Sequence, residues 1–140
     1  MEARQVRTYD SLLVFGGAVV HEYEMFGSYQ GLWFAKVTWD GVDGWITDYY
    51  GSCSGCDTLE SEIELILYHG DRRDESKEDV NAKLHEKLME IANDYKANIL
   101  TQEQAEAKAA EDIGWDMETD KMLAFVKENA WRKSDGAKEG

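Results

Sequence analysis

The segment that most restricts the fold is residues 18–50, which has the pattern of three β-strands joined by two short connectors. The stretches "AVVHEYEMF", "LWFAKVTW" and "WITDYY" are rich in β-branched and aromatic residues, which are enriched in strands. Between them lie "GSYQG" and "DGVDG", two glycine-containing connectors of five residues each, a length typical of hairpin loops. The segment therefore predicts a three-stranded antiparallel meander over about 18–50.

The register of this meander follows from its two hairpins. We close the first by pairing Phe26 with Leu32 and the second by pairing Trp39 with Trp45. Because side chains alternate across a sheet, these pairings place one mostly apolar set on a single face. The predicted core face consists of Val19, His21, Tyr23, Met25, Trp33, Ala35, Val37, Trp39, Trp45, Thr47 and Tyr49.

The opposite face of the predicted sheet carries a row of charges. Glu22, Lys36 and Asp48 follow one another across the three strands as acid, base and acid, which we interpret as a solvated ladder. A slip of one residue in either hairpin would bury these charges and expose the tryptophans. Both faces therefore favour the same register.

Helices are predicted after the meander from capping boxes and helical spacing. Asp57 with Glu60, Ser76 with Asp79, and Thr101 with Gln104 have the spacing of helix starts. The predicted helices span about 57–68, 76–97, 101–113 and 117–132. Residues 3–15 fit either a helix or a strand beginning at Ser11, and we favour the helix. The prediction is an α+β fold with helices covering one face of the sheet, as a single domain over 1–134 with a tail at 135–140.

The net charge of the chain restricts the classes of partner that it can bind. Its formal net charge is −14, so its surface repels phosphate backbones and anionic membranes. We therefore expect no direct nucleic-acid binding and no membrane association, and the acidity favours a partner with a basic surface. A role in solubility alone is the alternative. The polar N-terminus shows no apolar signal segment, which leads us to expect a cytoplasmic protein.

Two cysteines, Cys53 and Cys56, follow the last predicted strand in "YGSCSGCD". In a meander this stretch emerges at the same end of the sheet as "GSYQG", so we expect the two loops to be neighbours. The candidate binding site at this loop end consists of Tyr29, Gln30, Tyr50, Cys53 and Cys56. No catalytic constellation is evident, which favours a non-enzymatic role.

The chemistry of the two cysteines has three interpretations. Structural zinc takes four ligands, so a zinc site needs both cysteines from each of two chains. A dithiol at a helix start can exchange disulfides, but the nearby acids oppose a thiolate. We favour two small side chains in a tight turn, with no cofactor and no metal.

The motifs "GSYQG" and "YGSCSGCD" resemble those of small, uncharacterised proteins of phages and bacteria, over about residues 26–60. The resemblance implies a shared fold and carries no activity. Combined with the acidity, the resemblance leads us to expect a phage-type accessory factor that binds and inhibits a host protein in the host cytoplasm. Such a factor would serve anti-defence or host takeover, and its target could be a protein that handles nucleic acid. The alternatives are a metal- or small-molecule-binding protein and a thiol–disulfide protein. The acidic residues expected to contact the partner are Glu60, Glu62, Glu64, Asp71, Asp74, Glu75, Glu103, Glu106, Glu111 and Asp112.

Overall fold

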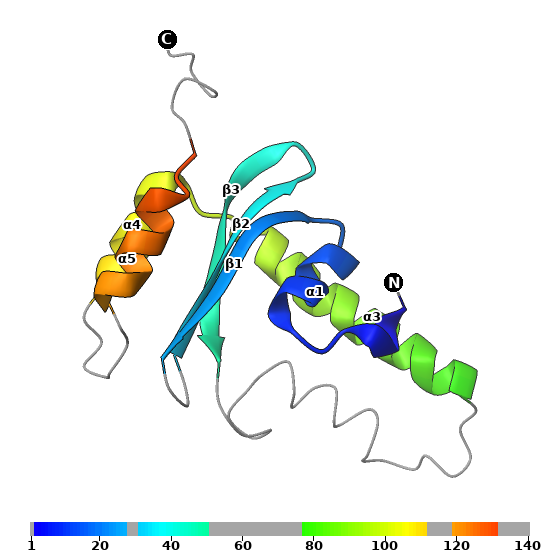
Figure 1. Cartoon of the computed structure of the whole chain (residues 1–140). Coiled ribbons are helices and arrows are strands. Elements are labelled where there is room, and N and C mark those ends of the chain that lie inside the picture. The colour runs from blue at the N-terminus through cyan, green and yellow to red at the C-terminus, as the bar shows by residue number, and fades with distance from the viewer. Residues whose placement is uncertain (1, 28–30, 51–76, 112–118, 132–140) are drawn as a thin grey trace.

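The computed structural model describes residues 2–27, 31–50, 77–111 and 119–131, and it has an α+β fold (Figure 1). A three-stranded antiparallel sheet has the order β1-β2-β3. The strands are β1 (Val19–Gly27), β2 (Gly31–Trp39) and β3 (Val42–Tyr50). The helices are η1 (Ala3–Gln5), a 3-10 turn, followed by α1 (Tyr9–Phe15), α3 (Lys77–Lys96), α4 (Gln102–Ala110) and α5 (Thr119–Glu128). The predicted fold class and meander are confirmed.

Three of the four predicted helices fall mostly within the described residues, and a helix is present in each of these places. The predicted capping box starts α4: Thr101 Oγ1 accepts from Gln104 N (3.1 Å), and Gln104 Oε1 accepts from Thr101 N (2.9 Å). α5 ends at Glu128, four residues before the predicted end. The predicted helix over 57–68 and the tail at 135–140 lie outside the described residues.

The N-terminal segment is helical, as favoured, but it is not one continuous helix. The 3-10 turn η1 is followed by α1, which begins after Thr8 because that side chain caps the helix by accepting from Ser11 N. Tyr9, Leu12 and Leu13 of α1 are buried. No helix in the described part of the chain is long and apolar enough to cross a membrane.

The first hairpin has the predicted register up to a β-bulge at His21. Phe26 pairs with Leu32 and Tyr23 with Ala35, as expected, and Glu22 pairs with Lys36. Beyond Glu22 the register shifts, so that Val20 pairs with Val37 and Val19 with Thr38. A bulge adds one residue to one strand and re-aims its side chain. His21 is exposed rather than part of the core face, so its predicted position was wrong, as was that of Val19.

The second hairpin differs from the prediction because its turn has two residues rather than five. Asp40 and Gly41 both have positive φ (51° and 80°), as a type I′ turn requires, so Trp39 pairs with Val42 rather than with Trp45. This shift of three residues is odd in number and turns every β3 side chain to the other face. Trp45 now lies opposite Lys36, where Asp48 was expected, so the predicted ladder was wrong.

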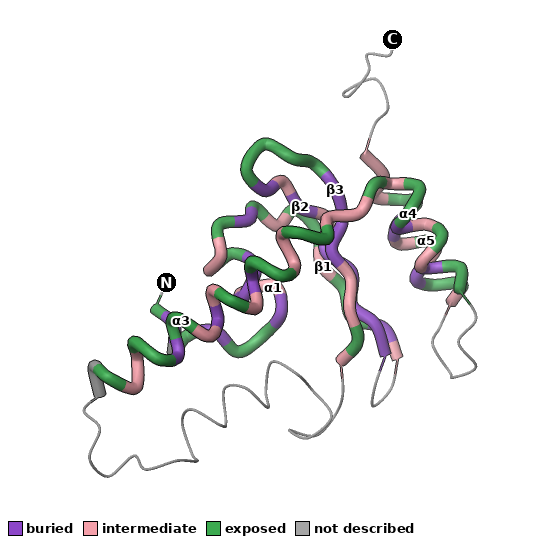
Figure 2. The backbone as a smooth tube through the Cα atoms, turned by 180° about the vertical axis from the view of Figure 1, so that it is seen from behind, coloured by how far each residue is buried: buried purple, intermediate pink, exposed green. Residues whose placement is uncertain are grey.

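Both faces of the sheet are therefore apolar, and the described helices cover both, which corrects the prediction of a single covered face (Figure 1). We call them the α1/α3 face and the α4/α5 face. Trp33, Ala35, Val37 and Trp39 enter a core with α1 and α3. Phe26, Leu32, Phe34 and Trp45 enter a second core with α4 and α5. Figure 2 shows the buried residues concentrated where the sheet meets the helical layers.

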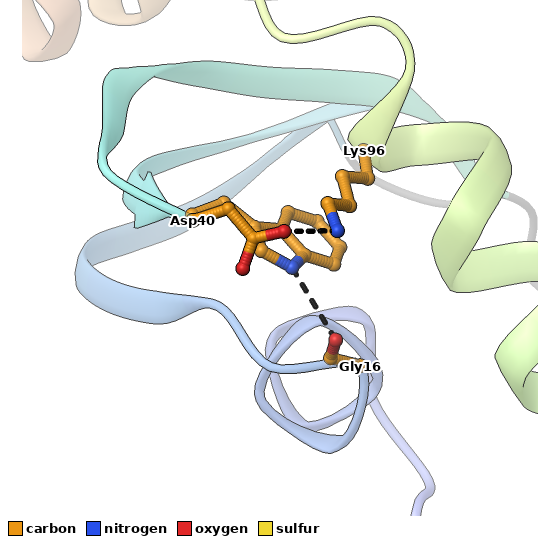
Figure 3. A network of polar contacts seen from close by, with 4 residues as sticks. Gly16, Asp40 and Lys96 are labelled. Carbon is orange, nitrogen blue, oxygen red and sulfur yellow. Dashed lines mark hydrogen bonds and ion pairs between the residues drawn. The ribbon is translucent and has the colours of Figure 1, made fainter.

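The Asp40-Gly41 turn is tied to helices on the α1/α3 face (Figure 3). The Asp40 carboxylate forms an ion pair with Lys96 in the last turn of α3. The neighbouring Trp39 Nε1 donates to the Gly16 carbonyl at the end of α1 (3.3 Å). These contacts fix the turn against the ends of two helices.

The outer edge of β3 is held by the segment between α3 and α4. Trp45 N donates to Leu100 O (2.9 Å), and Leu100 N donates to Trp45 O (2.8 Å). Gly44 faces this segment so closely that a Cβ there would lie 2.5 Å from Leu100 O. The chain crosses from the α1/α3 face to the α4/α5 face at this point.

Candidate functional site

At the loop end of the sheet, the structure describes Tyr50 and the adjoining ends of β1 and β2. Gly31 pairs with Gly27 on one side and with Tyr50 on the other. The Tyr50 hydroxyl donates to the carbonyl of Phe26 (2.8 Å), and the carbonyl of Gly27 lies 3.3 Å from the same hydroxyl. Tyr50 therefore closes the first hairpin from the neighbouring strand.

The two glycines of "GSYQG" have conformational roles at this end. Gly27 has φ +107°, which only glycine adopts readily, and a Cβ on Gly31 would overlap the Phe26 carbonyl. The motif is thus explained at both ends by the hairpin. The other members of the predicted loop-end site, Tyr29, Gln30, Cys53 and Cys56, lie outside the described residues.

The predicted acidic surface is described at three positions, all on or next to α4. Glu103 is exposed, with no ion pair or hydrogen bond among the described residues. Glu106 accepts from Gln102 Nε2 (2.9 Å), and Glu111 pairs with Lys108 (3.4 Å). Two of these three carboxylates therefore already have partners within the chain. The remaining predicted members, Glu60, Glu62, Glu64, Asp71, Asp74, Glu75 and Asp112, lie outside the described residues.

A polar row that the sequence reasoning missed crosses the α4/α5 face of the sheet. The Thr38 hydroxyl donates to Asp43 Oδ1 (2.7 Å), and His21 Nε2 lies 2.9 Å from Thr38 Oγ1. A hydroxyl has one hydrogen to donate, so Thr38 must accept from His21 and the proton sits on Nε2. In the neutral ring, Nδ1 is then an acceptor with no partner among the described residues.

Trp131, the last residue that the structure describes, packs on this row. The Trp131 ring meets His21 edge-on at 5.4 Å between centroids, and Lys36 Nζ lies 4.6 Å from the Trp131 ring centroid. Trp131 Nε1 donates to Gly44 O (3.0 Å). The sequence signal that could have found part of this row is the Asp-Gly turn, which sets the register of β3 and brings Asp43 opposite Thr38.

Gln102, at the start of α4, joins three elements beside this row. Its Oε1 accepts from Trp45 Nε1 (2.7 Å) and from Trp131 N (3.1 Å). Its Nε2 donates to Glu106 Oε2 (2.9 Å) and to Val126 O (3.2 Å). The amide thus satisfies polar groups of β3, α4 and α5 and of the segment that follows α5.

Neither His21 nor Asp48 lies where it was predicted. The His21 ring is exposed, and Asp48, predicted on the charged face, instead accepts from Tyr95 Oη (2.6 Å) on the α1/α3 face. Within the described ranges, no three His, Cys, Asp or Glu side chains come together as metal ligands. No protein-family model, curated protein or solved structure matches the chain.

Proposed function

We propose that this chain is a small acidic interaction protein, a phage-type accessory factor that binds and inhibits a host protein with a basic surface. The supporting observation is that several exposed acids in the described part of the chain have no partner there. Glu22, Glu24 and Glu103 are exposed and have neither an ion pair nor a hydrogen bond among the described residues. Together with the net charge of −14, these carboxylates favour a cationic partner.

The same charge sets the class of the partner. A phosphate backbone or an anionic membrane would be repelled, whereas a basic protein would be attracted over a distance of about 10 Å at ordinary ionic strength. A host protein that handles nucleic acid has such a basic surface. Its inhibition in the host cytoplasm would follow if the acidic chain covered that surface.

Affinity capture from host extract tests this proposal. We expect the immobilised chain to retain at least one basic host protein at about 25 mM salt and to release it at about 300 mM, because exposed charge pairs are screened. An unrelated domain of equal net charge is the control for ion exchange. The captured protein, once purified, should lose activity when the chain is added. Retention no better than that of the control would contradict the proposal.

A second candidate function is ligand binding at the loop end. It is favoured by the pairing of Gly31 with both Gly27 and Tyr50, which brings the flanks of "GSYQG" and "YGSCSGCD" together. If two chains share one zinc ion through four cysteines, purified protein should contain about half a zinc per chain. The Cys53→Ser/Cys56→Ser variant should contain none. If the wild type contains almost no zinc, the zinc site is contradicted. A disulfide-exchange assay on the wild type and the double variant then tests a thiol role.

A further inference from the structure

The helices of the α4/α5 face leave one border of the sheet uncovered. Phe34 and Trp45 are buried beneath α4 and α5, whereas β1 is exposed on the same face at Val19 (56%), Glu22 and Glu24. We call these three residues, with His21, the β1 margin. Its far end is closed by Phe26, whose ring contacts Phe125 at 5.6 Å between centroids.

Glu22 forms no ion pair with the lysine that lies opposite it in the sheet. Lys36 is its cross-strand partner, but the ammonium group lies over the Trp131 ring and makes no ion pair with Glu22. Glu24 lies opposite Phe34, which offers no charge. Among the described residues, Lys87, Lys96 and Lys108 form ion pairs with acids elsewhere. The carboxylates of Glu22 and Glu24 therefore have no cation beside them in the described part of the chain.

His21 adds a third acceptor to this strip. The bulge turns the ring out of the α1/α3 core. In the neutral ring, the Asp43–Thr38–His21 chain holds the proton on Nε2, which leaves Nδ1 as an acceptor. The margin therefore offers three acceptors beside an exposed valine, and the lysine that lies opposite it, Lys36, contacts Trp131 instead.

We propose that the β1 margin is the surface that binds the basic partner, through an extended partner segment with arginine or lysine at every second position. Glu22 and Glu24 are two residues apart on one strand face, a spacing of about 7 Å that matches alternate side chains of an extended chain. An arginine can bind each carboxylate through two hydrogen bonds. A second copy of this chain is disfavoured there, because it would bring its own acids to the same strip. The inference rests on the proposed function and assigns its surface.

A labelled peptide with the sequence Arg-Thr-Arg-Thr-Arg tests the assignment on the full chain at about 25 mM salt. We expect the Glu22→Gln/Glu24→Gln variant to bind it about tenfold more weakly than the wild type, since each exposed charge pair adds modestly. The matched control is Glu86→Gln/Glu128→Gln, which removes two exposed charges from α3 and α5 and should change binding less than twofold. A peptide of the same composition with its arginines in one block should bind the wild type more weakly than the alternating one.

The outcomes separate this inference from the proposed function. Equal losses in the two double variants, with unchanged circular dichroism, would overturn the β1 margin while leaving an acidic binder. A wild-type chain that binds neither peptide nor any host protein would overturn both. A wild-type chain that elutes as a dimer, lost in the Glu22→Gln/Glu24→Gln variant, would show that a second copy occupies the margin and would also overturn the inference.

Discussion

Replacing Gly31 with alanine should prevent the first hairpin from closing in its native register. An alanine Cβ at this position would overlap the Phe26 carbonyl oxygen, and the Phe26 carbon atom would lie 2.9 Å away. Both are backbone atoms of the neighbouring strand, so no side-chain rotation can relieve the overlap. The Tyr50 hydrogen bond to the same carbonyl would be lost as well. We expect a loss of more than about 3 kcal/mol in the free energy of unfolding, or failure to fold.

Gly41→Ala is the matched control for this substitution. Gly41 also has an unusual backbone, with φ +80°, but a Cβ there would meet no atom within 4 Å. Its alanine variant should therefore lose only about 1–2 kcal/mol from left-handed strain. Urea titration of the three proteins compares them directly. A Gly31→Ala variant as stable as Gly41→Ala would contradict the close approach at the loop end.

Replacing Gln102 with alanine should loosen the whole α4/α5 layer. Trp45 is fully buried, and its Nε1 donates only to Gln102 Oε1 among the described residues. The substitution would also leave Trp131 N and Val126 O without this partner. Because each buried polar group without a partner costs about 1–3 kcal/mol, we expect a total loss of about 3 kcal/mol.

Two further variants identify the cause of this loss. Glu103→Ala, at the next and exposed position of the helix, should change stability by less than about 0.5 kcal/mol. Gln102→Glu keeps an acceptor for Trp45 and Trp131 but loses the donor to Val126 and places a carboxylate beside Glu106, so it should be intermediate. Tryptophan fluorescence during chemical denaturation reports each transition. Equal stability of Gln102→Ala and Glu103→Ala would contradict the linking role of Gln102.

Local signals in the sequence predicted the elements well, because their causes are local. The Thr101–Gln104 capping box placed the start of α4, and the helical spacing from Val80 to Tyr95 placed α3. The meander followed from strand composition. None of these elements depends on knowing what packs against it.

The arrangement of the layers was harder to predict because it depended on one turn. "DGVDG" contains two Asp-Gly pairs, and treating the whole stretch as a loop moved β3 by three residues and placed Trp45 on the wrong face of the sheet. Asp40-Gly41 is the strongest short-range hairpin signal in this stretch, and with it the register follows. The His21 bulge had no such signal, because the Thr38–Asp43 pair and Trp131 that surround His21 come from distant positions. The candidate site on the α4/α5 face was missed for the same reason.

The double burial of β2 makes the chain unequally tolerant of changes in length. Successive β2 side chains alternate between two separate cores, so the insertion or loss of one residue in its interior would exchange the contents of both layers at once. β1 already accommodates an additional residue at His21 without disturbing the pairs on either side. During divergence, single-residue insertions and deletions should therefore accumulate in the border strand and be eliminated from the central one.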